Sequence, residues 1–192
     1  MKVEKSQITI NPINQLNLFG YEHYFDFFEK LYKNNKLPHS ILLSGNKGLG
    51  KTTFVYHFIN FLLSQGEEKK YNKEKFSIDP NNSSYTLTVN GTHSNLFILD
   101  AFDDENIKVD QIRKLLLFLN KTTYYKGLKL VIIDNAEKLS INSSNALLKA
   151  IEEPSNDTYF FVINNDTQKL LNTIKSRCIE FNINFSFKSM LV

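Results

Sequence analysis

The sequence is poor in the residues that cross-link or anchor a chain, and each shortage excludes a class of protein. Its single cysteine, Cys178, leaves no partner for an internal disulfide and no ligand set for a cysteine-rich zinc site. No apolar run approaches the roughly 20 residues of a membrane helix. The first residues, MKVEKSQITI, lack the apolar core of a signal peptide. We therefore expect a cytoplasmic protein without membrane contact.

Charge and composition indicate an ordinary globular protein. Hydrophobic residues make up 42% and charged residues 22% of the 192 residues, with 16 Phe, 9 Tyr and no Trp. This mixture predicts an aromatic-rich core within one domain that spans residues 1–192. The net charge of +3 is small for a dedicated nucleic-acid binder, which usually carries a stronger basic excess.

Apolar runs and helical patterns alternate along the chain. Short apolar runs predict strands, and apolar residues at helical spacing predict helices. Such an alternation is typical of an α/β fold with a parallel sheet sandwiched by helices. The polar segment 66–84 predicts a solvated loop or insertion. The predicted helices are 20–34, 51–64, 109–120, 141–152 and 169–175, and the predicted strands are 41–43, 96–99, 130–133, 159–163 and 178–185.

The strongest local signal is a glycine-rich loop at residues 45–52, which fits the phosphate-binding pattern G-x-x-x-x-G-K-[ST]. A short apolar run precedes it and an amphipathic helix follows it, as the motif requires. Glycines let backbone N–H groups turn towards a phosphate, and the helix N-terminus adds its positive dipole end. Lys51 would reach the β- and γ-phosphates, and Thr52 would ligate Mg²⁺. The candidate nucleotide-binding residues here are Gly45, Asn46, Lys47, Gly48, Leu49, Gly50, Lys51, Thr52 and Thr53.

A second part of the predicted site is an acid at a strand end. Asp134 follows the apolar run 130–133 and would join Thr52 in the Mg²⁺ shell. The next residue is Asn135, and an amide cannot accept a proton from water as a carboxylate can. Glu137 is expected on a different side of the backbone. The sequence therefore predicts nucleotide binding with slow or negligible hydrolysis.

Several further motifs resemble one family, the AAA+ subunits of bacterial DNA polymerase III clamp loaders. The resemblance runs from about residue 19 to residue 181, nearly the whole chain. Its motifs are LPHS at 37–40, VDQIR at 109–113, DNAEKL at 134–139, SSNALLKAIEEP at 143–154 and SRC at 176–178.

The resemblance implies a role in DNA replication. Clamp loaders are pentamers that place a ring-shaped sliding clamp on primed DNA, and ATP lies between their subunits. In this family the SRC arginine, here Arg177, is an arginine finger that reaches the nucleotide of a neighbouring subunit. A polar residue that senses the γ-phosphate is expected at a strand end, and Asn164 and Asn165 are both candidates. The implied partners are gamma/tau and delta subunits, the sliding clamp and, through the complex, primed DNA.

Departures from the family pattern favour delta-prime, a subunit with weak or no ATPase activity of its own. Hydrolysing members carry Glu where this chain has Asn135, and many have a four-cysteine zinc module; the absence of cysteine between Lys51 and Asp134 excludes zinc. The chain ends at Val192, so the lid and collar domains of the family are expected to be absent. A hydrolysing gamma/tau-type subunit, a stand-alone P-loop ATPase or kinase, and a scaffold with a vestigial P-loop remain alternatives.

Overall fold

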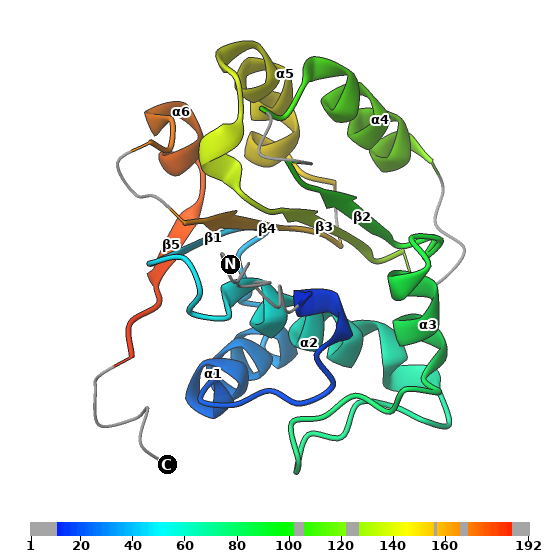
Figure 1. Ribbon diagram of the computed structural model, residues 1–192. Helices are drawn as coiled ribbons and strands as arrows, with labels where there is room; N and C mark the ends of the chain where they lie inside the picture. The colour runs from blue at the N-terminus through cyan, green and yellow to red at the C-terminus, as the bar shows by residue number, and fades with distance from the viewer. Residues whose placement is uncertain (1–10, 102–105, 122–126, 156, 166–168, 186–192) are drawn as a thin grey trace, which may run out of the picture.

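A computed structural model describes residues 11–101, 106–121, 127–155, 157–165 and 169–185 of the chain. Its centre is a five-stranded sheet in the order β2-β3-β4-β1-β5, in which every neighbouring pair of strands is parallel (Figure 1). The predicted α/β class is confirmed. The strands are β1 (Ser40–Ser44), β2 (Leu96–Leu99), β3 (Lys129–Ile133), β4 (Thr158–Asn164) and β5 (Ile179–Asn182).

Helices cover both faces of the sheet. Figure 1 shows α1 and α2 against one face, with α3 beside them, and α4, α5 and α6 against the other. No helix in the described part of the chain is both long and apolar enough to cross a bilayer. The helices are α1 (Glu22–Lys33), α2 (Lys51–Leu63), α3 (Ser83–Val89), α4 (Val109–Asn120), α5 (Ile141–Glu152) and α6 (Asn172–Lys175), with short 3₁₀ turns at Pro12–Asn14, Ser64–Gly66 and Ala136–Lys138.

The central strands divide the core into two layers. Successive side chains of a strand point to opposite faces of its sheet. In β4, Phe161 and Ile163 accordingly pack with the layer of α1 and α2, whereas Phe160 and Val162 pack with the layer of α4 and α5. Burial on both faces explains why the middle of each of these strands is a continuous apolar run rather than an alternating one.

The predicted aromatic-rich core lies mainly between α1, α2 and the sheet. Phe25 of α1 contacts five other aromatic rings with centroids 5.1 to 6.4 Å away, and stacks on Tyr71. Phe58 of α2 connects this group to Phe161 of β4. Aromatic pairs favour edge-to-face and offset geometries, and each such pair contributes about 0.5–1.5 kcal/mol beyond the burial of its area.

The polar segment before α3 is only partly a solvated loop. Apart from isolated bridges that Ser77 makes to Asn72 and to Asn17, residues 67–82 form turns and irregular backbone. Tyr71 and Ile78 nevertheless point into the core, each no more than 5% exposed. The Asn82 side chain accepts a hydrogen bond from the backbone N–H of Tyr85 and caps the N-terminus of α3. This helix is absent from the sequence-based prediction.

The other element boundaries agree with the sequence to within a few residues, except near the C-terminus. The helices predicted at 109–120 and 141–152 are confirmed as α4 and α5, and the strand at 96–99 as β2. The helix predicted at 169–175 is shorter, because α6 begins only at Asn172. The strand predicted at 178–185 is limited to Ile179–Asn182. The N-terminal sequence MKVEKSQITI lies outside the described residues.

Candidate nucleotide-binding site

The glycine-rich loop joins β1 to α2, the arrangement that its pattern predicts. Gly48 and Gly50 have φ angles of +86° and +82°, a region that glycine occupies at no steric cost. At Gly45 a side chain would also collide with the backbone, because a Cβ there would lie 2.6 Å from the carbonyl oxygen of Ile183. The loop conformation therefore depends on glycine at these positions.

Lys51 lies at the start of α2 with its ammonium group turned back into the loop. Nζ donates hydrogen bonds to the carbonyl oxygens of Gly45, at 2.9 Å, and Asn46, at 2.8 Å. The residue is only 2% exposed. Burial lowers the pKa of Lys51, and the nearby carboxylates of Asp134 and Glu137 oppose that effect. The loop thus holds a buried cation that is hydrogen-bonded to the loop's own carbonyl oxygens.

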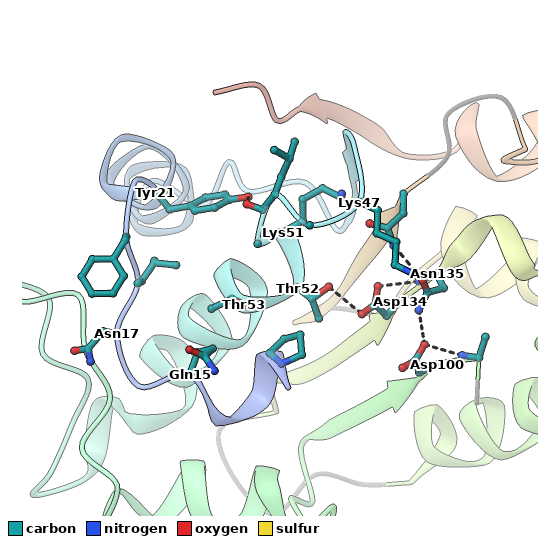
Figure 2. A pocket seen from close by; sticks show the side chains of 18 of the residues that line it. Gln15, Asn17, Tyr21, Lys47, Lys51, Thr52, Thr53, Asp100, Asp134 and Asn135 are labelled. Atoms are coloured by element: carbon teal, nitrogen blue, oxygen red, sulfur yellow. Dashed lines mark hydrogen bonds between the residues drawn. The ribbon is translucent and has the colours of Figure 1, made fainter. Parts of the chain in front are cut away.

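Asp134 follows β3 and faces α2. Its Oδ2 accepts a hydrogen bond from the Thr52 hydroxyl at 2.9 Å, and its Oδ1 accepts one from the backbone N–H of Asn135 at 2.8 Å (Figure 2). Burial, with a smaller contribution from Asp100, raises the pKa of Asp134, while both hydrogen bonds oppose the rise. The predicted pair of Thr52 and Asp134 is brought together.

Asn135 adopts a left-handed conformation, with φ of +53°. Its side-chain Nδ2 donates to Asp100 Oδ1 at 2.8 Å, and its Oδ1 accepts from Asn165 Nδ2 at 3.1 Å. Asp100 was not predicted as a site residue. It directly follows the apolar strand β2, as Asp134 follows β3, and that repeated pattern is a signal that could have found it.

The two candidate sensor residues have different places. Asn164 is the last residue of β4 and is 1% exposed, whereas Asn165 lines the pocket. The backbone N–H of Asn165 donates to Glu137 Oε2 at 3.1 Å. Glu137 itself is not among the pocket-lining residues; its carboxylate is turned towards the end of β4.

The P-loop, Asp134, Asn135 and Asn165 line a cavity of about 630 Å³, a size typical of small-molecule sites (Figure 2). Sequence reasoning missed one of its walls, the segment before α1. The Tyr21 hydroxyl there donates to the carbonyl oxygen of Leu49 at 2.9 Å, and burial raises the pKa of Tyr21. No motif marks this wall. The predicted residues that line the cavity are Lys47, Gly48, Leu49, Gly50, Lys51, Thr52, Thr53, Asp134 and Asn165. The wall that was not predicted consists of Pro12, Gln15, Asn17, Leu18, Phe19 and Tyr21.

Arg177 is not among the residues lining this cavity. It follows α6, where Nε donates to Glu152 Oε2 at 3.1 Å and Nη1 donates to the carbonyl oxygen of Thr173 at 3.0 Å. Within one chain the arginine therefore pairs with a carboxylate at the end of α5. Burial raises the pKa of the adjacent Cys178 thiol to about 12, so this cysteine is a poor nucleophile at neutral pH.

The sheet order, the glycine-rich loop after β1 and the acid after β3 define an AAA+ P-loop fold. A family model described as "DNA polymerase III, delta subunit" matches residues 20–186. The chain belongs to that family.

Three known proteins illustrate the relationship. The delta-prime subunit of DNA polymerase III from Pseudomonas aeruginosa is 36% identical over 151 residues, covering 74% of this chain and 42% of the relative. The tau/gamma subunit from Haemophilus influenzae is 30% identical over 172 residues, covering 90% of this chain and 24% of the relative. The chain thus spans less than half the length of either. A solved gamma subunit-related protein from Thermotoga maritima has the same fold, with a TM-score of 0.57 at 22% identity, covering 84% of this chain and 47% of that one.

Proposed function

We propose that this chain binds Mg-ATP in the pocket beside its P-loop and hydrolyses it slowly or not at all. In DNA replication it would act as a delta-prime-like subunit of a clamp loader. The observation that carries the proposal is a single cavity lined by Lys51, Thr52 and Asp134, with Asn135 beside them.

Binding follows from groups that the loop already orients. Lys51 Nζ would exchange its two carbonyl acceptors for phosphate oxygens, gaining charge-assisted hydrogen bonds. The Thr52 hydroxyl and the Asp134 carboxylate are hard oxygen donors held 2.9 Å apart, which fits Mg²⁺ shared with the phosphates. When bound, Mg²⁺ would neutralise charge on the phosphate oxygens. The described residues contain no group of three or more His, Cys, Asp or Glu that could hold a metal without a nucleotide.

Low turnover follows from Asn135. Both polar atoms of its side chain are engaged, one by Asp100 and one by Asn165. An amide is also too weak a base to take a proton from the attacking water. Nucleotide would therefore stay bound as ATP in the isolated chain.

The role of Arg177 would lie in a neighbouring subunit. Its pair with Glu152 is on the surface, with side chains 29% and 55% exposed. Such a pair is worth only about 0–1 kcal/mol, so its release costs little. A guanidinium directed at a neighbour's γ-phosphate would stabilise charge in the transition state. The proposed partners are gamma/tau and delta subunits, the sliding clamp and primed DNA, in the cytoplasm.

A hydrolysing gamma/tau-type subunit is the second candidate. Two observations favour it: the carboxylate of Asp100 lines the same cavity, and the similarity to a tau/gamma subunit covers 90% of this chain.

Calorimetry of the purified chain with Mg-ATP, combined with phosphate release in the same sample, separates these candidates. We expect binding without measurable turnover. Binding with turnover at ordinary enzyme rates would move the assignment to the hydrolysing subunit. A chain that binds no Mg-ATP would contradict the proposal.

The arginine is tested in the assembled complex. With gamma/tau and delta subunits added, Arg177→Ala is expected to lower the rate of ATP hydrolysis at the neighbouring site that Arg177 enters by about 10³-fold or more, the range known for arginine fingers. Lys175→Ala is the matched control, since Lys175 is a nearby cation paired with Glu180 at 3.1 Å. Equal hydrolysis by both variants would show that Arg177 has only its structural pair with Glu152.

A further inference from the structure

Three hydrogen-bonded side chains form a row across the carboxyl ends of β2, β3 and β4, which are neighbours in the sheet. Asp100 follows β2, Asn135 follows β3 and Asn165 follows β4. One bond runs from Asn165 Nδ2 to Asn135 Oδ1, at 3.1 Å. The other runs from Asn135 Nδ2 to Asp100 Oδ1, at 2.8 Å (Figure 2). All three residues line the cavity.

The carboxylate dictates how both amides are oriented. An ionised carboxylate accepts hydrogen bonds and donates none, so Asn135 must turn its Nδ2 towards Asp100. The Asn135 Oδ1 then points to Asn165. Because this oxygen only accepts, Asn165 must donate to it from its own Nδ2. The amide nitrogen of Asn165 carries a second hydrogen, and a phosphate oxygen is a suitable acceptor for it.

Backbone groups at both ends of this row of side chains are held by hydrogen bonds. Asp100 Oδ1 also accepts the backbone N–H of Ala101 at 2.7 Å, and its carbonyl oxygen accepts from Gln111 Nε2 of α4 at 3.1 Å. At the other end, the backbone N–H of Asn165 donates to Glu137. Because these bonds hold the backbone at both ends, the side-chain amides of Asn135 and Asn165 can still turn about their own bonds.

We propose that Asp100, Asn135 and Asn165 form an amide-orienting relay, in which the negative charge of Asp100 turns Asn165 so that its N–H faces the γ-phosphate. The inference rests on the proposed nucleotide binding at this pocket. Asp100 and Asn135 are positioning residues that act through Asn165. Asn135 then has a role of its own as a hydrogen-bond donor to Asp100. A glutamate at this position would bring a like charge to Asp100 and no donor.

The relay and simple electrostatics make opposite predictions for Asp100→Asn. Removing a negative charge beside the phosphates would by itself tighten ATP binding. An amide at position 100, however, both donates and accepts, so Asn135 and Asn165 lose their fixed orientation. We expect the preference for Mg-ATP over Mg-ADP to fall by about threefold to tenfold, the range that one ordinary hydrogen bond supplies.

Calorimetry with both nucleotides on the purified chain is the test, with two further variants. Asn135→Gly keeps the left-handed backbone but breaks the relay, and should lower the preference as much as Asp100→Asn does. The double variant should show no further loss, because both changes break one path. Asp26→Asn is the matched control, a surface acid on α1 that pairs with Lys73. Tighter ATP binding by Asp100→Asn, or additive losses in the double variant, would overturn the relay.

A measurement without nucleotide separates this inference from the proposed function. In the ligand-free chain, side-chain amide hydrogens of Asn135 and Asn165 should exchange with solvent more slowly than those of exposed asparagines, as followed by NMR. Asp100→Asn should remove that protection. If the wild-type chain binds no nucleotide but shows this protection, the proposed function fails, and with it the contact to the γ-phosphate, while the orientation of the two amides by Asp100 stands. Unprotected amides in a chain that does bind Mg-ATP would contradict the relay alone.

Discussion

Lys51 keeps an ammonium group in a position that is only 2% exposed. Two carbonyl oxygens of its own loop accept its hydrogens, so the charge is solvated by the backbone that would also bind phosphate. Hydrogen bonds to charged groups are worth about 1.5–3 kcal/mol. A phosphate would offer Lys51 stronger acceptors than these carbonyls do.

Replacing Lys51 by alanine is therefore expected to weaken Mg-ATP binding by at least about tenfold. Stability should change little, by about 1 kcal/mol or less, because the buried charge and its desolvation cost are removed together. Calorimetry and chemical denaturation measure the two effects. Lys69→Ala, at a surface lysine 3.9 Å from Asp79, is the control. Unchanged affinity in Lys51→Ala would place the phosphates elsewhere.

At the scale of the elements, the packing of α2 on β4 holds the P-loop helix to the sheet. Phe161 is fully buried at the middle of β4, and its ring lies 6.0 Å from that of Phe58 in α2. Phe58 in turn contacts Phe25 of α1. A change at Phe161 therefore alters the packing between the sheet and the helix that begins at Lys51.

Phe161→Ala is expected to lower the free energy of unfolding by about 3–5 kcal/mol, the cost of removing a buried aromatic ring and leaving a cavity. Urea denaturation measures it. Phe27→Ala is the matched control; Phe27 is 43% exposed on α1 and should cost about 1 kcal/mol or less. Similar losses in both variants would mean that the two aromatic sites are equally buried in solution.

The sequence indicated those elements whose signal is local. Apolar runs bounded by polar residues marked β2 and β3, and the P-loop pattern marked the start of α2 at Lys51. α3 was missed because its sequence, SSYTLTV, is short and places its apolar residues at alternate positions, 85, 87 and 89, a period that is typical of a strand; its signal is the cap at Asn82. The wall before α1 depends on Tyr21 meeting Leu49, 28 residues away, and no local pattern reports such a contact.

At the scale of the whole molecule, His57 joins three distant segments. It is fully buried in α2; Nε2 bonds the carbonyl oxygen of Gln15, at 3.0 Å, and Nδ1 bonds the Tyr71 hydroxyl, at 3.1 Å. A carbonyl only accepts, so Nε2 donates and Nδ1 accepts from the tyrosine. The neutral imidazole thus ties α2 to the pocket wall and to the segment before α3.

This arrangement predicts that the chain loses stability in mild acid. Burial lowers the pKa of His57 from 6.5 to about 4, so between these values the unfolded chain binds a proton that the folded chain does not. The contribution is complete above pH 6.5 and is lost as the pH falls towards 4, at about 1.4 kcal/mol per pKa unit. His93, whose pKa burial also lowers, acts in the same direction.

Urea denaturation from pH 7.5 to about pH 4.5 measures the effect in the wild-type chain and in two variants, with the window set by these pKa values. His57→Gln can keep a donor and an acceptor but does not titrate, so its stability should fall less steeply with acid. His23→Gln, at an exposed position of α1, should follow the wild-type chain. Because His57 connects the pocket wall to α2, acid should also weaken Mg-ATP binding more in the wild-type chain than in His57→Gln. Parallel curves for all three proteins would show that the histidine is not held neutral by its burial.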